Sequence, residues 1–286
     1  MTAATGIEGA PLLKLAAMDK IAFIGGGNMA SAIIGGLLKS GRAAQSAIVV
    51  EPFEPQRDKL LADFGIRALA AADASLAQAT LVVWAIKPQL FTAAALPCAA
   101  HVGQASHLSV MAGIRSDAIA HATGSQRVVR AMPNTPALIG QGIAGLFARD
   151  AVTPAEKAQI EALLAPTGET LWVAREDDLD AVTALSGSGP AYVFYFVEAM
   201  MQAALEMGLS ATQGRRLALA TFAGATALAQ QSEDPPELLR ERVTSKGGTT
   251  FAALAAMEAD GVKSAVVRAV KAAQVRAREL GDEFGA

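Results

Sequence analysis

Residues 20–30 read KIAFIGGGNMA, a short apolar run that leads through three glycines into a helical pattern. The apolar residues 21–24 predict a buried strand, and residues 30–39 predict an amphipathic helix. A strand, a glycine turn and a helix in this order open the dinucleotide-binding halves of α/β proteins. The stretch therefore predicts a Rossmann-like unit at this point of the chain.

The turn has the pattern G-x-G-x-x-A, formed by Gly25, Gly27 and Ala30. Gly25 permits the tight turn, Gly27 lets the backbone approach a pyrophosphate, and Ala30 allows the helix to pack closely on the strand. The helix N-terminus favours the phosphate charge. Such glycines can be purely structural, but their position directly after a strand favours dinucleotide binding. The predicted cofactor contacts here are Gly25, Gly27, Asn28, Met29 and Ala30.

Downstream of this unit, short apolar runs alternate with longer amphipathic ones. Alternation of this kind predicts an α/β fold with a doubly wound, Rossmann-like parallel sheet. A second helix is predicted at 55–64. The predicted strands are 21–24, 47–50, 81–86, 108–111, 128–131, 143–147 and 170–173.

After Glu176 the pattern becomes entirely helical, so we place a domain boundary near Arg175. The expected domains are a dinucleotide-binding domain at 18–175 and a helical dimerisation and substrate domain at 176–286. Residues 1–17 lack the pattern of a signal peptide, and we expect them to form a mobile extension. Helices are predicted at 178–185, 189–207, 211–231, 236–243, 251–257 and 262–280.

Composition limits the possible functions. Hydrophobic residues make up 52% of the 286 residues and charged residues 18%, which favours burial of surface between subunits. The net charge of −3, without basic runs, indicates neither nucleic acid nor an anionic membrane as a partner. The single cysteine, Cys98, excludes an intrachain disulfide, argues against a cysteine-rich metal site and fits the cytoplasm.

The predicted helix at 189–207 is apolar on most sides. Its polar residues Glu198, Gln202 and Glu206 are spaced four apart and share one narrow face. A helix of this kind must be buried on most sides, and its charges argue against a membrane span. The pattern is compatible with a central core helix and with a subunit interface.

Two further regions follow predicted strands and are candidates for cofactor binding. Glu51 ends the second strand, where a carboxylate can accept hydrogen bonds from ribose hydroxyls and would repel a 2′-phosphate, which favours NADH. Arg57 lies close enough in sequence to complicate that inference. Ile86, Lys87 and Pro88 follow the strand at 81–86, at the edge of the sheet where ligands bind. An exposed loop lysine is the alternative for Lys87.

A third region, residues 243–251, reads VTSKGGTTF between two helical patterns. Glycines, hydroxyls and the start of a helix together suit a small carboxylate with one further polar atom. The alternative is a capped turn with Thr249 or Thr250 as the N-cap residue.

Four motifs in order make the chain resemble pyrroline-5-carboxylate reductase over nearly its whole length after Met18. They are FIGGGNMASAI (23–33), WAIKPQ (84–89), RAMPNTP (130–136), and the pair SGSGPAY (186–192) and ERVTSKGGTTFAAL (241–254). Two positions depart from the family pattern. Lys246 stands where the family often has proline, and Glu51 stands where an uncharged or different residue is frequent.

The resemblance implies reduction of 1-pyrroline-5-carboxylate to L-proline with NADPH or NADH, and a dimer within a larger ring of dimers. The residues themselves suit this substrate, because the amides of Gly247 and Gly248 and the hydroxyls of Ser245 and Thr249 would hold its carboxylate. Thr250, matched to the family threonine, would be the catalytic residue and reach the ring nitrogen. A protonated iminium already accepts hydride well, so the enzyme would mainly hold the imine carbon close to the nicotinamide. Asn134, in the loop after the strand at 128–131, would flank the cofactor or serve only as a rigid turn.

Two other functions compete with this interpretation. A β-hydroxyacid dehydrogenase-like reductase shares the layout but typically needs a lysine for proton transfer, and the segment at 186–192 has none. A non-catalytic, dinucleotide-sensing protein would keep Gly25, Gly27 and Ala30 but would have no use for residues 245–250.

Overall fold

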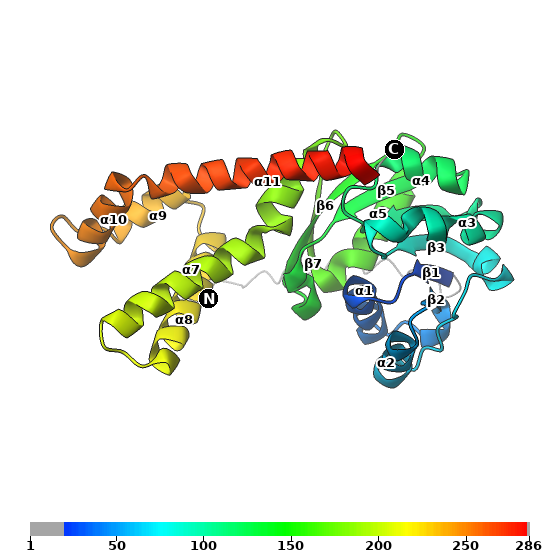
Figure 1. Cartoon of the computed structure of the whole chain (residues 1–286), viewed down its shortest axis with the longest axis horizontal. Helices are drawn as coiled ribbons and strands as arrows, with labels where there is room; N and C mark the ends of the chain where they lie inside the picture. The colour runs from blue at the N-terminus through cyan, green and yellow to red at the C-terminus, as the bar shows by residue number, and fades with distance from the viewer. Residues whose placement is uncertain (1–19, 285–286) are drawn as a thin grey trace, which may run out of the picture. The chain divides into compact units, whose positions relative to one another are not determined.

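The computed structural model describes residues 20–284, so the extension expected at 1–17 lies outside them. The chain forms two compact units (Figure 1). The first runs to Leu179 and resumes at Leu280, and the second spans Asp180–Glu279. The change of character that the sequence shows near Arg175 lies close to the passage from one unit to the other.

The first unit is built on one seven-stranded sheet with the order β2-β1-β3-β4-β5-β6-β7. Its strands are β1 (Lys20–Ile24), β2 (Ala47–Val50), β3 (Ala79–Trp84), β4 (Ser106–Ser109), β5 (Val128–Met132), β6 (Gly142–Ala148) and β7 (Gly168–Trp172). Five of the six neighbouring pairs are parallel, as the alternation of strands and helices predicted. The doubly wound, Rossmann-like fold is therefore confirmed.

One pairing departs from the parallel sheet that the sequence predicted: β5 and β6 are antiparallel. Only residues 133–141 connect them, and they contain one short 3₁₀ segment, η4 (Thr135–Ile139). A parallel crossover needs a dozen or more residues, usually a helix, whereas an antiparallel pair can be joined by a short turn. The length of this connection thus sets the direction of β6.

Both faces of the sheet are buried at β1, β2, β3 and β5, because neighbouring residues on these strands enter opposite cores. Ile21 and Phe23 of β1 pack into one hydrophobic cluster, and Ala22 and Ile24 pack into the other. Residues of α1, α2 and α5 join the first cluster, and residues of α3 and α4 join the second. These helices are α1 (Asn28–Lys39), α2 (Glu54–Phe64), α3 (Phe91–Val102), α4 (Ser116–Thr123) and α5 (Pro154–Leu164).

Two strands end earlier than their apolar runs predicted. The run at 81–86 is a strand only to Trp84, and the run at 108–111 is a strand only to Ser109. Ala85 and Met111 continue these runs beyond the strands, and Met111 is buried in the second hydrophobic cluster. Hydrophobicity therefore marked the burial of these segments and not the limits of their strand pairing.

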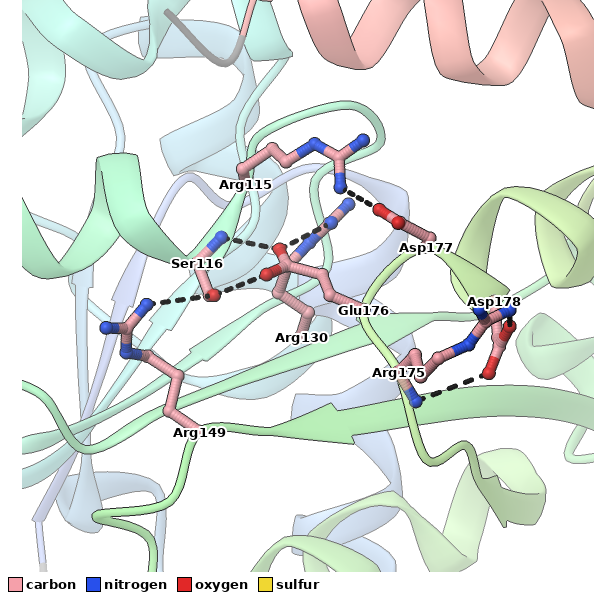
Figure 2. Close-up of polar contacts among 8 residues, drawn as sticks. All are labelled: Arg115, Ser116, Arg130, Arg149, Arg175, Glu176, Asp177 and Asp178. Atoms are coloured by element: carbon pink, nitrogen blue, oxygen red, sulfur yellow. Dashed lines mark hydrogen bonds and ion pairs between the residues drawn. The ribbon is translucent and has the colours of Figure 1, made fainter.

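A network around Glu176 holds the chain where it leaves the sheet after β7 (Figure 2). One carboxylate oxygen accepts from the Ser116 backbone N–H at 2.7 Å and from Arg130 Nη1 at 2.8 Å. The other accepts from the Ser116 hydroxyl at 2.6 Å. Glu176 thereby caps the start of α4 and pairs with an arginine of β5 whose side chain is only 8% exposed. The network fixes three segments that are distant in sequence.

The second unit is all helical, as expected. It contains most of α6 (Asp178–Val182), the π-helical turn η6 (Thr183–Gly187), α7 (Gly189–Glu206), α8 (Ala211–Gln230), α9 (Pro236–Arg242), α10 (Thr249–Ala259) and all but the end of α11 (Val262–Phe284). Helices α7 and α8 pack closely at Gly214, where an added Cβ would lie only 2.9 Å from the Ala204 Cβ. Among the described residues, no helix is both long enough and apolar enough to cross a membrane.

Helix α7 is not a central core helix within this chain, which was one of the two interpretations of its sequence. Within the helix only Val197 and Ala204 are buried, whereas Phe194 is 59% exposed and Tyr195 is 71% exposed. Exposed apolar surface of this extent marks a site of protein association. The exposure favours the other interpretation, in which α7 contributes to a subunit interface.

Candidate active site

The glycine loop after β1 is shaped by contacts with the segments that follow β2 and β3. Gly25 has a φ of +95°, and a Cβ added there would lie 2.5 Å from the Ala85 carbonyl oxygen and 2.6 Å from Ile86 Cγ2. Its backbone N–H donates to the Val50 carbonyl at 2.8 Å. Glycine is therefore required at position 25 for both its conformation and its close approach to the neighbouring loop.

Gly26, which the sequence reasoning did not single out, also cannot carry a side chain without rearrangement. A Cβ there would lie 2.5 Å from Cδ1 of Leu60, a fully buried residue of α2. The Gly26 carbonyl accepts from Gln56 Nε2 at 2.5 Å and from the Ser31 hydroxyl at 3.2 Å. The middle glycine of the run was the only signal in the sequence that pointed to this constraint.

Gly27 leads into α1 and leaves space in front of the helix. It is the N-cap residue with extended backbone, and a Cβ added to it would meet no heavy atom within 4 Å. No side chain caps α1, and its first turn, which contains Asn28 and Met29, has no acidic residue. Ala30 is fully buried against the sheet. Open space beside uncapped N–H groups fits the pyrophosphate of a dinucleotide.

Glu51, directly after β2, is bound to this loop. Its Oε2 accepts from the Gly26 N–H and its Oε1 accepts from the Phe53 N–H, each at 2.9 Å. Arg57 Nη1 donates to the carbonyl oxygens of Glu51, at 3.1 Å, and of Pro52, at 2.6 Å. The carboxylate is thus held beside the glycine loop, where the sequence predicted a contact with ribose.

The loop after β3 lies next to the glycine loop because β1 and β3 are neighbours in the sheet. Since β1 pairs with β2 on its other edge, the chain changes direction across the sheet between β1 and β3, which is where open α/β sheets bind ligands. Ile86 contacts the position of Gly25, whereas Lys87 is exposed and Pro88 begins the short segment η3 (Pro88–Leu90).

Asn134 has a structural contact of its own. Its Oδ1 accepts from the Ile143 backbone N–H at 3.0 Å, which ties the loop after β5 to β6. The segment η4 that begins beside it packs against α1. This geometry agrees with the rigid-turn alternative for Asn134 and keeps the loop close to the helix that follows the glycine turn.

In the second unit, residues 243–251 form a turn that leads into α10. Gly248 is the N-cap residue of this helix, with no side-chain capping bond, so the alternative in which Thr249 or Thr250 caps the helix is wrong. Gly247 has a φ of +74°, and the Gly248 N–H donates to the Ser245 carbonyl at 3.0 Å. Glycines at 247 and 248 provide the turn without using a threonine hydroxyl.

The hydroxyls of Ser245, Thr249 and Thr250 have no hydrogen-bond partner within residues 20–284. Ser245 and Thr249 are exposed, and Thr250 is half-buried. By contrast, the hydroxyl of Thr244 donates to the Arg240 carbonyl at 2.6 Å. Thr244 therefore has a structural role, whereas the other three hydroxyls are available to a ligand.

The structure brings together Gly25, Ile86 and, through Gly26, Glu51. Residues 245–250 lie in the other unit and form a separate local cluster. The first group has an open glycine loop before an uncapped helix, and the second has uncommitted hydroxyls at the start of another helix.

Two family models match this chain, one in each part of the sequence. Residues 176–280 match the family model described as pyrroline-5-carboxylate reductase dimerisation, and residues 20–113 match NADP oxidoreductase coenzyme F420-dependent. The chain is 41% identical to pyrroline-5-carboxylate reductase of Pseudomonas aeruginosa over 268 residues, which cover 93% of this chain and 98% of that protein.

Solved structures give the same result. The structure of a pyrroline-5-carboxylate reductase from Coxiella burnetii superposes with a TM-score of 0.85 at 32% identity, covering 92% of this chain and 98% of that one. A pyrroline carboxylate reductase from Plasmodium falciparum, solved with NADP bound, has a TM-score of 0.82 at 25% identity, covering 92% and 98%. The order of motifs, the fold and these similarities agree, and the chain belongs to the pyrroline-5-carboxylate reductase family.

Proposed function

We propose that the chain reduces the cyclic imine 1-pyrroline-5-carboxylate to L-proline with NADPH or NADH, the last step of proline biosynthesis. The observation that carries the proposal is the presence of two complementary sites in a member of this family. The first unit has an open glycine loop, and the second has a turn whose hydroxyls are uncommitted. A sensor protein would need only the first of these.

The first unit holds the dinucleotide. Gly27 and the uncapped start of α1, with Asn28 and Met29, take the pyrophosphate, while Glu51 takes the adenosine ribose. Ile86, Lys87 and Pro88 line the adjacent edge, and Asn134 positions the loop after β5. When bound, the reduced nicotinamide supplies the hydride.

The second unit holds the imine by its carboxylate. Hydroxyls of Ser245 and Thr249 and the N–H of Gly247 supply donors, and the start of α10 adds a favourable dipole. The Gly248 N–H already donates to Ser245, so Gly248 contributes mainly through its backbone conformation. Thr250 orients the ring nitrogen. These roles follow the family motif, and the uncommitted hydroxyls support them.

No strong general acid is required at this site. The imine nitrogen can be protonated before binding, and the amine of proline keeps that proton at neutral pH. The chain has three histidines, all between residues 101 and 121, and one cysteine, Cys98. The work of the protein is therefore to position and orient the substrate, and it needs no proton relay.

The chain also associates with itself. The apolar side chains exposed on the second unit suit burial against another subunit, and the family model that matches residues 176–280 is one of dimerisation. We extend this to a dimer formed by the helical units, assembled further into a ring of dimers in the cytoplasm. Sedimentation of the purified protein would distinguish a monomer, a dimer and a larger ring.

A substrate comparison tests the proposed function. Purified protein is mixed with NADH or NADPH and 1-pyrroline-5-carboxylate, and the nicotinamide absorbance is followed. We expect rapid decay with this imine and no formation of reduced cofactor from a β-hydroxy acid and the oxidised dinucleotide. Tight cofactor binding without decay would support the sensor alternative, and turnover of the hydroxy acid alone would support the dehydrogenase alternative.

A further inference from the structure

We propose that Glu51 makes this chain prefer NADH over NADPH. The inference rests on the proposed function, because it concerns the dinucleotide that the first unit binds. It concerns a single position, at the end of β2, where open α/β sheets contact the adenosine ribose. The two cofactors differ only in a phosphate on the 2′ oxygen of that ribose, so a fixed charge here discriminates between them.

The carboxylate of Glu51 is oriented by the backbone on both sides. Oε2 accepts from the Gly26 N–H of the glycine loop, and Oε1 accepts from the Phe53 N–H, each at 2.9 Å. A carboxylate has about four acceptor positions in total. One remains on each oxygen, which suits the two hydroxyls of an unmodified ribose.

The same two bonds prevent the charge from moving away. A 2′-phosphate would lie against a carboxylate that can leave only by giving up both N–H donors. Gly26 is buried within the loop, so leaving its N–H without an acceptor would carry a desolvation cost. Repulsion between two negative groups, combined with this restraint, disfavours the phosphorylated cofactor.

Two nearby cations are engaged with other acceptors. Arg57 Nη1 is directed to the carbonyl oxygens of Glu51 and Pro52. Lys59 pairs with Asp63 at 2.6 Å on the exposed side of α2. Sites for a 2′-phosphate instead direct an arginine or lysine to that position.

Equilibrium binding without substrate tests the proposal. The wild-type protein is titrated with NADH and with NADPH, and the nicotinamide fluorescence is followed. We expect a Kd for NADPH at least about tenfold higher than that for NADH, which corresponds to one fixed repulsive contact. In Glu51→Gln, the Kd for NADH should rise and that for NADPH should fall, so that their ratio shrinks at least about tenfold.

Glu54→Gln is the matched control. It removes an equal charge from the same segment, but Glu54 is exposed and lies beyond the end of the strand. The NADPH-to-NADH ratio should not change in this variant. Thermal unfolding of all three proteins checks that the variants remain folded.

Two results would overturn the proposal. One is wild-type protein that binds NADPH as tightly as NADH or more tightly, and this measurement needs no variant. The other is a Glu51→Gln protein that is folded and loses affinity for both cofactors equally, because Glu51 would then only shape the glycine loop. Failure of the proposed function is distinguishable, since it would appear as NADH binding without imine reduction.

Discussion

Replacing Glu176 with alanine removes the acceptor of three hydrogen bonds at once (Figure 2). Arg130, whose side chain is only 8% exposed, keeps its charge but loses its carboxylate partner. Breaking a buried ion pair by removing one partner costs about 3–5 kcal/mol, because the remaining charge is left uncompensated. Glu176→Gln keeps the shape and one acceptor, so we expect a smaller loss, of about 1–3 kcal/mol.

Thermal unfolding measures this effect. For a unit of this size, 1 kcal/mol corresponds to roughly 2–4 °C in Tm, so Glu176→Ala should lower the Tm by roughly 6–20 °C. Asp63→Asn is the control, because Asp63 pairs with Lys59 on the surface, where both side chains are more than 40% exposed. Exposed pairs contribute about 0–1 kcal/mol. All proteins are compared at one concentration, since association raises apparent stability.

Equal Tm values for Glu176→Ala and Asp63→Asn would exclude this stabilising role of Glu176. The network would then contribute no more than a surface pair, and the position of the chain after β7 would depend on other contacts. A large loss in Glu176→Ala with a smaller one in Glu176→Gln would support the account.

Three further predictions concern the substrate, the cofactor and pH. Thr250→Ala should lower kcat by about tenfold, which is the value of one hydrogen bond to the reacting group, and leave the Kd for NADH unchanged. The control Thr244→Ala removes a hydroxyl that is already bound to the backbone, so it should retain the wild-type kcat. Equal kcat values for the two variants would exclude Thr250 from the mechanism. Gly25→Ala should destabilise the first unit by roughly 2–5 kcal/mol and weaken dinucleotide binding, because Gly25 has a φ of +95° and the new Cβ would lie 2.5 Å from a carbonyl oxygen. A calorimetric titration in which this variant binds the dinucleotide with wild-type affinity would contradict this. Burial lowers the pKa of His107 from 6.5 to about 4. Between pH 6.5 and pH 4 the imidazole is therefore protonated in the unfolded chain and neutral in the folded chain. The contribution of His107 to the free energy of unfolding should therefore be full above about pH 6.5 and fall by about 3 kcal/mol towards pH 4. Denaturant titrations at several pH values should show that the free energy of unfolding of His107→Gln depends less on pH than that of the wild-type protein.

The local parts of the fold could be predicted from the sequence. The strand, glycine turn and helix at 20–39 each depend on residues that are neighbours in the chain, and all three are where the pattern placed them. The direction of β6 was not predicted, because it depends on the length of a connection and not on the residues of the strand. An apolar pattern also looks the same whether a helix is buried in its own domain or against another subunit. The sequence could not decide this for α7.

The candidate site was predicted in composition but not in its contacts. The sequence identified Glu51 by its distance from the glycine loop, yet the bonds to Gly26 and Phe53 join residues that only the fold brings together. The role of Gly26 against Leu60 has the same origin. Ser116, Arg130 and Glu176 come from three separate elements and formed no sequence pattern. The roles of Ser245, Thr249 and Thr250 remain predictions, and Thr250→Ala tests the last of them.

The central claim is that the chain reduces a cyclic imine to an amino acid. Its most direct test is the stoichiometry of the reaction with 1-pyrroline-5-carboxylate, with NADH consumed and L-proline formed measured in the same sample. About one proline should form for each NADH oxidised, as required by transfer of a single hydride. Oxidation of NADH without proline, or no oxidation by a protein that binds NADH, would contradict it.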